Sequence, residues 1–324
     1  MTSRQNQIVN KLKKIILSAL FVAFLGLSGS WWFVNSDYQK SESANPVKVS
    51  NIPWLKRYVS LENDPSEWHD DPFIFDENGI VQFDYGGSIG TQYNPATIAQ
   101  YALANYNFFL KTGQLDYKDQ FLKQAEYLIH NFDEKGQDSI GYPYHFDYSS
   151  YELKSPWYSA LAQGQIISVL TRVFYMQGDA RALAIIRGTK NFLVTPTDQG
   201  GLLTHTPEGY VWLEEFPTEQ PSLVLNGFVF AIFGLYDYLN IFPDDQKTKD
   251  LYNECLISLK ESMQFYDTGS WVKYQRFPYG DLVTKHYMKF QILQNLQLYL
   301  MTGDPYFAEL YRKWDFYFSN KIYP

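Results

Sequence analysis

The sequence predicts a mainly α-helical protein made of about four stacked helical hairpins, and two patterns support this fold class. Turn signals recur at Gly113, Gly178, Pro243 and Gly303, at intervals of about 60–65 residues, a length that suits two helices and a connection. An apolar segment precedes each turn and an amphipathic segment follows it. We therefore expect the first helix of each pair to be inner and the second to lie in an outer layer.

Residues 1–35 read as a cytoplasmic stub and a signal-anchor helix. Basic residues precede an apolar run from Ile15 to Val34, which at about 20 residues is long enough to cross a bilayer, and Trp31 and Trp32 suit its far interface. Because a basic flank stays in the cytoplasm, we expect a single-pass membrane protein whose remaining chain lies outside the cytoplasm. A cleaved signal peptide is the alternative, with small residues at 28–30 as the cleavage site.

The chain after the apolar run divides into three parts. Residues 36–52 form a polar linker. Residues 53–92 read as a short β-rich segment, in which Asn78-Gly79 predicts a β-hairpin with a type I′ turn. Residues 93–324 form the helical domain.

The strand-like connections between hairpins are rich in aromatic residues. Their sequences are GYPYHFDYSSYELKSPW and GGLLTHTPEGYVWLEEF, and both lead into an inner helix. Connections repeated at one end of the inner helices are expected to form the wall of a cleft, where sites are commonly built on loops held by a rigid scaffold.

Composition excludes several classes of function. A net charge of −8 without clusters of Lys and Arg argues against nucleic-acid binding. One cysteine cannot form an intramolecular disulfide, and the five histidines lack the spacing of a metal site, so we expect no metal and no cofactor. The 27 tyrosines offer many flat surfaces with polar tips, which suit sugar rings.

Glu214 and Glu215 form an unusual acidic pair, because Leu213 and Phe216 flank them and an apolar helix follows. Apolar surroundings raise the pKa of a carboxyl group by desolvation, as a base near neutral pH requires. Pro217 keeps Phe216 out of helical geometry, so Glu215 stays in the connection. The alternatives are a solvated loop acid, or a charge that favours the dipole of the next helix.

Three blocks of the helical region indicate a family: SPWYSALAQGQIISVLTRVF, WLEEFPTEQPSLVLNGFVFAIFGLYDY, and SWVKYQRF followed by HYMKFQILQNL. Across roughly residues 90–320 the chain resembles the C-terminal domain of the D-glucuronyl C5-epimerases. The resemblance implies an incomplete (α/α) toroid and an isomerase without a cofactor. Such an enzyme converts D-glucuronate to L-iduronate in polysaccharides of the heparan sulfate type.

The resemblance also implies site residues. Inversion of C5 requires proton removal from one face of the sugar and proton return to the other, and the family's two groups correspond to Glu215 and Tyr287. A phenol ordinarily has a pKa of about 10, so a cation such as Lys285, Lys289 or Arg276 would assist Tyr287. The expected substrate-binding residues are Gln100, Ser159, Gln163, Asn226 and Arg276. The alternative for the buried amides is that they bond to neighbouring backbone or to each other.

The chain departs from the family pattern near these residues. Phe216 stands where the family has tyrosine, and Val272 replaces another tyrosine. Gln275 stands where the family has arginine, with Arg276 one place later, and Met288 replaces a histidine. The group that binds the uronate carboxylate is therefore expected to differ.

These patterns together predict a uronic acid C5-epimerase that acts on a polysaccharide during its synthesis. One rival is a polysaccharide lyase, because the same C5 carbanion can expel the C4 substituent. Another is a non-catalytic uronan-binding or assembly protein. The expected partners are a uronic-acid polysaccharide and the membrane, and a homodimer is a further possibility.

Overall fold

The structure is a computed structural model that describes residues 58–59, 64–65, 68, 72–136, 138–278 and 280–320. The predicted signal-anchor helix at residues 1–35 and the linker at residues 36–52 lie outside the described residues. No helix within the described ranges has both the length and the apolar character that a membrane span requires.

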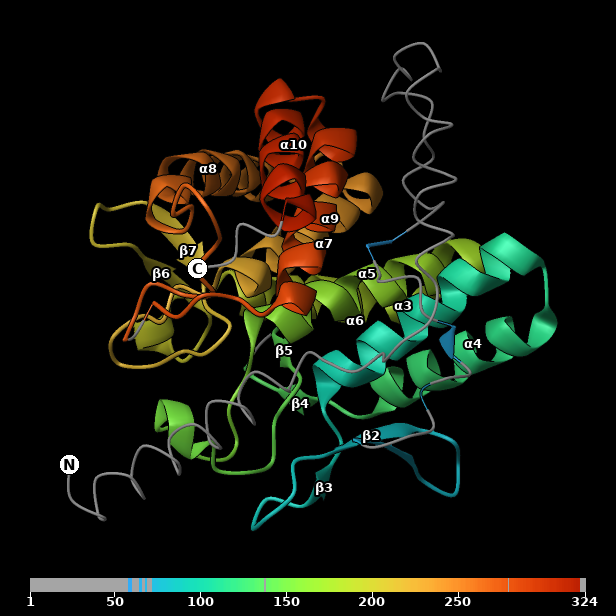
Figure 1. The fold of residues 1–324 in the computed structure, drawn as a ribbon. Coiled ribbons are helices and arrows are strands. Elements are labelled where there is room, and N and C mark those ends of the chain that lie inside the picture. Colours follow the sequence, from blue (N-terminus) through green and yellow to red (C-terminus); the bar gives the residue numbers. More distant parts are fainter. Residues whose placement is uncertain are drawn as a thin grey trace.

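The described residues are mainly helical, and their helices pair in chain order as the turn pattern predicts (Figure 1). Three of the first helices end on a glycine with a left-handed backbone: Gly113 (φ 73°), Gly178 (φ 68°) and Gly303 (φ 69°). Glycine adopts this conformation without a Cβ clash, which is why it ends helices. The hairpins are α3 (Pro95–Thr112) with α4 (Leu115–His130), α5 (Ala160–Gln177) with α6 (Ala180–Leu193), α7 (Leu225–Ile241) with α8 (Gln246–Ser262), and α9 (Lys285–Thr302) with α10 (Pro305–Ser319).

Helices α3, α5 and α7 are inner helices, since most of their residues are buried on every side. Helices α5 and α7 approach closely because Gly164 on α5 lies against α7. A Cβ added to Gly164 would come within 2.7 Å of the Ala231 Cα. Helices α4, α6 and α8 bury a smaller share of their residues, as expected of an outer layer.

Replacing Gly164 by alanine is expected to lower the free energy of unfolding by about 1–3 kcal/mol. The added methyl group would overlap the carbonyl oxygen of Phe230 and push α5 and α7 apart. Urea denaturation of the wild type and the variant measures the difference. An unchanged midpoint would show that the two helices separate at no cost.

Helix α9 departs from the prediction that every first helix is buried on all sides. Lys285 and Lys289 are exposed, and the buried residues of α9 are fewer than those of α7. Helix α9 packs mainly on α10 and touches α7 much less extensively than α5 does.

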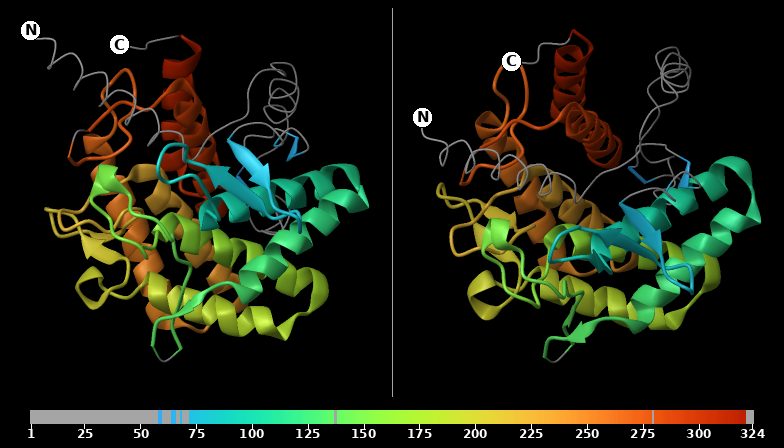
Figure 2. Two further views of the ribbon diagram at one scale, coloured as in Figure 1. Left: turned by 90° about the horizontal axis from the view of Figure 1, so that it is seen from below. Right: turned by 60° about the horizontal axis from the view of Figure 1, so that its bottom comes forward.

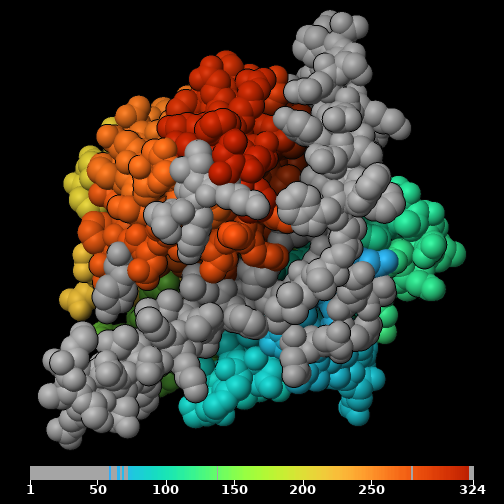
Figure 3. All heavy atoms as spheres, viewed as in Figure 1, coloured from blue at the N-terminus to red at the C-terminus, as the bar shows by residue number. Residues whose placement is uncertain are grey.

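In Figure 3 the red surface of the last hairpin lies at the opposite end of the visible face from the cyan surface of the sheet region.

A three-stranded antiparallel sheet of β1 (Phe73–Phe75), β2 (Val81–Asp84) and β3 (Thr91–Gln92) precedes the helices and packs on α3 (Figure 2). The predicted hairpin is present, but its turn is not type I′. Gly79 has φ 75°, whereas Asn78 is not among the residues with positive φ, and type I′ needs both. The Asp76 carboxylate explains the difference, because it accepts the N–H groups of Asn78 at 2.9 Å and Ile80 at 2.7 Å.

Short elements form the connections between the hairpins. Strands β4 (Asp133–Glu134) and β5 (Ile140–Gly141) pair after α4, and β6 (Leu203–His205) pairs with β7 (Val211–Leu213) after α6. Single 3₁₀ turns are η4 (Ser149–Tyr151), η5 (Thr197–Gln199) and η6 (Met263–Phe265).

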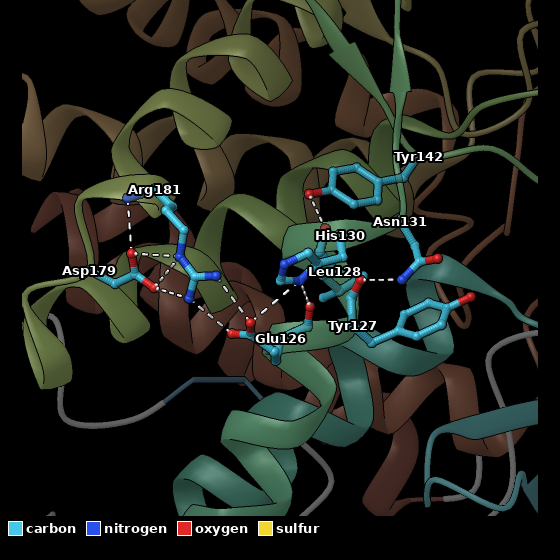
Figure 4. Close-up of polar contacts among 8 residues, drawn as sticks. All are labelled: Glu126, Tyr127, Leu128, His130, Asn131, Tyr142, Asp179 and Arg181. Carbon is cyan, nitrogen blue, oxygen red and sulfur yellow. Dashed lines mark hydrogen bonds and ion pairs between the residues drawn. The ribbon is translucent and has the colours of Figure 1, made fainter.

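Polar contacts tie the first hairpin to the second (Figure 4). Arg181 at the start of α6 donates to both carboxylate oxygens of Glu126 on α4, each at 3.1 Å, and to Asp179 at 2.7 Å. The Tyr142 hydroxyl donates to the Leu128 carbonyl at 3.0 Å. This last bond fixes the start of an aromatic connection against α4.

A buried ion pair fills the interior near the C-terminal ends of α5 and α7. Arg172 donates to Asp237 at 2.7 Å, and the Arg172 guanidinium lies over the Tyr58 ring at 5.1 Å. Tyr58 is held by two hydrogen bonds of 2.9 Å between its backbone and the Asn107 amide on α3. Charged and aromatic side chains thus occupy this end of the interior, and the aromatic connections lie at the other.

Candidate active site

Connections that precede three helices meet at the N-terminal ends of α5 and α7. The N–H of Ala160, the first residue of α5, donates to the Glu214 carbonyl at 2.9 Å. The N–H of Leu225, the first residue of α7, donates to the Tyr274 carbonyl at 3.1 Å. Tyr274 belongs to the connection before α9, so residues far apart in the chain are fixed beside one another.

Glu215 lies at this meeting point and is 6% exposed. Its Oε1 accepts a hydrogen bond from the Tyr274 hydroxyl at 3.1 Å, and its Oε2 has no partner among the described residues. The carboxylate lies against Gly227 in the first turn of α7, where any Cβ would overlap Oε2. Gly227 therefore makes room for the acid at the positive end of a helix dipole.

The pKa of Glu215 is raised to about 8, mainly because burial disfavours its charged form. The hydrogen bond from Tyr274 opposes this rise, and the charge of Glu214 adds to it. A carboxyl group with a pKa near neutrality can both accept and return a proton, as acid–base catalysis requires.

The Glu214 carboxylate, unlike that of Glu215, is bonded to the turn before α7. It is 1% exposed and accepts the Ser222 hydroxyl at 2.7 Å and the Leu223 N–H at 3.0 Å. Leu223 has φ 53°, a conformation that side-chain-bearing residues rarely adopt, and Tyr266 also holds it by donating to its carbonyl at 2.5 Å. Burial raises the Glu214 pKa to about 7. Glu214 thus shapes the turn that starts α7.

Tyr274 lies between Glu215 and Tyr287. Its hydroxyl contacts Glu215, and its ring packs on the edge of the Tyr287 ring with centroids 5.3 Å apart. Tyr287 is 1% exposed in the first turn of α9, where its N–H donates to Thr284 Oγ1 at 3.4 Å. The structure therefore places both residues implied by the resemblance in one buried cluster.

The aromatic connection before α5 covers Glu215. Burial, and next the charge of Glu215, raises the pKa of Tyr144, Tyr148 and Tyr151, which shows that all three hydroxyls lie near this acid. The Tyr151 ring stacks on Phe216 at 3.9 Å, and its hydroxyl donates to Gln275 Oε1 at 2.6 Å. The bond from Tyr151 to Gln275 joins this connection to the one before α9.

Three of the predicted substrate-binding residues lie on α3, on α5 or directly before α5. Ser159 precedes the first residue of α5 and is 2% exposed, directly beside the Glu214 backbone contact. The Gln163 amide bonds to the N–H and carbonyl of Tyr142, at 3.2 and 3.4 Å, as the alternative of backbone satisfaction anticipates. Gln100 is half-buried on α3 and is not joined to Glu215 by any hydrogen bond within the described ranges.

The other two predicted substrate-binding residues differ in their surroundings. Asn226 is 1% exposed next to Gly227, and neither amide atom has a partner in the described part of the chain. Arg276 donates to both carboxylate oxygens of Glu208, at 2.7 and 2.8 Å, and stacks over Phe265 at 3.8 Å. The charge of Arg276 is therefore already paired with Glu208, which argues against Arg276 as a contact for the substrate carboxylate.

The sequence interpretation missed Tyr274 and Tyr151. Tyr274 directly precedes Gln275, in the segment from which the resemblance implies Arg276 rather than Tyr274. Tyr151 belongs to a connection whose aromatic density was the only sequence signal. Among the described residues, no group of three His, Cys, Asp or Glu side chains is arranged to hold a metal ion.

The melting temperature of the wild type is expected to fall as the pH rises from about 5 to 8. The folded-state pKa values of Glu215 and Glu214, about 8 and about 7, lie above the ordinary 4.5. Between these values the folded protein binds more protons than the unfolded chain, so stability falls with rising pH. Calorimetry of the wild type and Glu215→Gln tests this, because the variant should show a shallower decline. Parallel curves would contradict the raised pKa.

Two sugar epimerases share the fold with this chain. Cellobiose 2-epimerase from Bacillus thermoamylovorans superposes with a TM-score of 0.51 and 10% identity, over 74% of this chain and 64% of the other. A sugar epimerase from a ruminal bacterium gives a TM-score of 0.50 and 13% identity, over 77% and 66%. At such low identity these likenesses show the fold alone, and they support the (α/α) toroid type.

The family match defines the class of this protein, which is that of the carbohydrate epimerases, a group of isomerases. The chain belongs to the D-glucuronyl C5-epimerase C-terminus family, which matches residues 135–316. This membership confirms the resemblance seen in the sequence.

Two relatives show how far the likeness extends. An uncharacterized protein of Methanocaldococcus jannaschii is 32% identical over 315 residues, which cover 92% of this chain and 94% of the relative. The D-glucuronyl C5-epimerase of Caenorhabditis elegans is 34% identical over 166 residues. That match covers 48% of this chain but only 27% of the nematode enzyme.

Proposed function

We propose that this protein inverts C5 of a uronic acid within a polysaccharide. The observation that carries the proposal is the buried row of Glu215, Tyr274 and Tyr287, in which the acid has a pKa of about 8. Two proton-transfer groups, one from the connection before α7 and one from the first turn of α9, suit a reaction that needs one group on each face of the sugar.

In the proposed reaction the Glu215 carboxylate takes the C5 proton, and the electron pair of the C–H bond delocalises into the uronate carboxyl group. The Tyr287 hydroxyl then gives its proton to C5 from the opposite face. Glu215 is left protonated and Tyr287 ionised, and exchange with solvent restores both. The reverse direction exchanges the two roles.

The surroundings of Glu215 favour this use. The raised pKa of Glu215 reduces the difference between its pKa and that of the weakly acidic C5–H group, which lowers the free-energy cost of proton transfer. The N-terminal end of α7 and the Tyr274 hydroxyl supply positive potential and a hydrogen bond where negative charge develops. Because Glu215 is 6% exposed, some of the side chains that cover it must move to admit a sugar.

Incubation of the full chain with a panel of uronic-acid polymers in D₂O tests the proposal. The expected result is deuterium at C5 together with the second epimer, both read by NMR. Ultraviolet-absorbing unsaturated uronate would identify a lyase instead. Binding of a polymer without deuterium at C5 would identify a non-catalytic uronan-binding protein. Either result would overturn the proposal.

Several finer expectations stay predictions. Heparan-type chains are the substrate that the family resemblance suggests, and the altered residues Phe216, Val272, Gln275 and Met288 make other uronans equally worth testing. Anchoring through residues 1–35 and exposure of the helical domain outside the cytoplasm are tested by carbonate extraction and N-terminal sequencing. Sedimentation analysis tests the homodimer.

A further inference from the structure

The proposed reaction leaves two buried groups in protonation states that must be reversed. After C5 is inverted, Glu215 carries a proton and Tyr287 has lost one, and the next turnover in the same direction needs the opposite arrangement. Glu215 is 6% exposed and Tyr287 is 1% exposed, so solvent reaches both slowly while the site is closed. A direct path for a proton from Glu215 to Tyr287 would restore both groups without opening the site.

Tyr274 lies between these two groups. Its hydroxyl donates to Glu215 Oε1 at 3.1 Å, and its ring meets the Tyr287 ring at an angle of 69°, with centroids 5.3 Å apart. Tyr274 is itself 6% exposed. Burial, and next the charges of Glu215 and Tyr287, raise the pKa of Tyr274 well above its ordinary value. The Tyr274 hydroxyl therefore lies near both groups and stays protonated.

Backbone contacts on both sides hold Tyr274 in place. Its N–H donates to the Asp281 carbonyl at 2.8 Å, and its carbonyl accepts the N–H of Leu225, the first residue of α7, at 3.1 Å. The backbone of Tyr287 is fixed by Thr284, whose hydroxyl oxygen accepts the Tyr287 N–H at 3.4 Å. Both tyrosines are thus held in a fixed relation, which favours a proton transfer repeated at every turnover.

Tyr151 also lies near both groups, but its hydroxyl proton is engaged elsewhere. Burial and then the charge of Glu215, with a smaller contribution from Tyr287, raise the pKa of Tyr151. The Tyr151 hydroxyl donates to Gln275 Oε1 at 2.6 Å. An amide oxygen accepts a hydrogen bond but does not titrate, so it passes no proton on. Tyr151 therefore joins two connections rather than two titrating groups.

We propose that Tyr274 relays a proton from Glu215 to Tyr287 between turnovers and so resets the site. The protonated Glu215 gives its proton to the Tyr274 oxygen while the Tyr274 hydroxyl gives its own proton to the Tyr287 phenolate. One O–H bond forms and one breaks on Tyr274, which is neutral before and after the transfer. The inference rests on the proposed function, because it starts from the protonation states that the reaction leaves.

The relay is downhill and needs little movement. A phenol ordinarily has a pKa of about 10, which is above the value of about 8 for Glu215, so transfer from this acid to a phenolate is favourable. The carboxyl torsion of a glutamate is soft, and a half-turn exchanges its two oxygens without needing more room. Whichever oxygen takes the C5 proton can therefore turn to face Tyr274.

The hydrogen isotope at C5 reports the relay when the reaction runs in D₂O. At low substrate concentration the free enzyme exchanges with solvent between turnovers, and the product should carry deuterium at C5. At saturating concentration the relay returns the abstracted hydrogen before exchange is complete, so the deuterium content of the product should fall as the concentration rises through KM. The substrate is an oligosaccharide of the uronan that the D₂O panel identifies, and the initial product is read by NMR.

Tyr274→Phe removes the relay but keeps the aromatic ring and both backbone contacts. Its product should carry full deuterium at every concentration, and kcat should fall by about 10²-fold, as the loss of a positioned proton-transfer group predicts. The matched control is Tyr151→Phe, which removes a nearby hydroxyl bonded to Gln275. The deuterium content of its product should follow the wild-type curve. A merely structural role for Tyr274 would lower the rate without changing the isotope pattern.

Two results would overturn the inference. The first is a wild-type product whose deuterium content does not change with substrate concentration, and this result is decisive even if Tyr274→Phe does not fold. The second is a Tyr274→Phe product whose deuterium content falls as that of the wild type does, which would place the proton path elsewhere. Failure of the proposed function looks different, because neither the second epimer nor deuterium at C5 would appear at any concentration.

Discussion

Replacing Glu215 by glutamine is expected to abolish epimerisation, with kcat reduced by about 10²–10⁴-fold or more, the usual contribution of a general acid or base. Glutamine preserves the shape of the side chain and can still accept the Tyr274 hydroxyl, but it cannot take the C5 proton. The measurement is deuterium incorporation at C5 together with the rate of appearance of the second epimer. Thermal denaturation confirms that the variant is folded.

Glu214→Gln is the matched control, because the two glutamates are adjacent and both are buried. A glutamine at residue 214 can accept the Leu223 N–H and pair with the Ser222 hydroxyl, so the turn before α7 should persist. We expect most of the activity to remain. Equal damage from both substitutions would show that the acidic pair acts through the shape of the turn rather than through proton transfer by Glu215.

Tyr287→Phe is expected to abolish epimerisation to a similar extent, because only one face of the sugar would retain a proton-transfer group. The isotope pattern makes this result specific. With substrate labelled at C5, the variant should still release label from the epimer whose proton Glu215 removes, but it should form little of the other epimer. A folding defect would instead stop release from both epimers.

Tyr142→Phe is the control for loss of a buried hydroxyl, since this group donates to the Leu128 carbonyl on α4. It should lower stability and leave the ratio of label release between the two epimers unchanged. Activity close to that of the wild type in Tyr287→Phe would contradict the assignment and direct attention to Tyr274, which contacts both Glu215 and Tyr287.

Local patterns in the sequence were enough to predict much of the fold. Turn glycines such as Gly113 and Gly178 mark conformations that other residues adopt at a cost, and apolar periodicity separates inner from outer helices. The same local reasoning missed the turn at Asn78, where the Asp76 side chain imposed a different geometry. It also overstated the burial of α9, because apolar content does not tell how many neighbours a helix has.

The candidate site divides in the same way. The apolar flanks of Glu215 and the family blocks are visible in the sequence, so the sequence predicts both Glu215 and Tyr287. The pairing of Arg276 with Glu208 was not visible, because the two residues come from different connections. The bond from Tyr274 to Glu215 crosses 59 residues and that from Tyr151 to Gln275 crosses 124.

The sequence by itself therefore determined the helical repeat and the family, and it predicted Glu215 and Tyr287 as site residues, since each of these inferences depends on residues close together in the chain. The tertiary structure alone decided which tyrosine contacts Glu215, which cation is already paired and which amides remain unpaired. Those outcomes depend on how helices and connections distant in sequence pack together. Burial then raises the pKa of Glu215, and the amides of Asn226 and Gln291 have no partner within the described part of the chain.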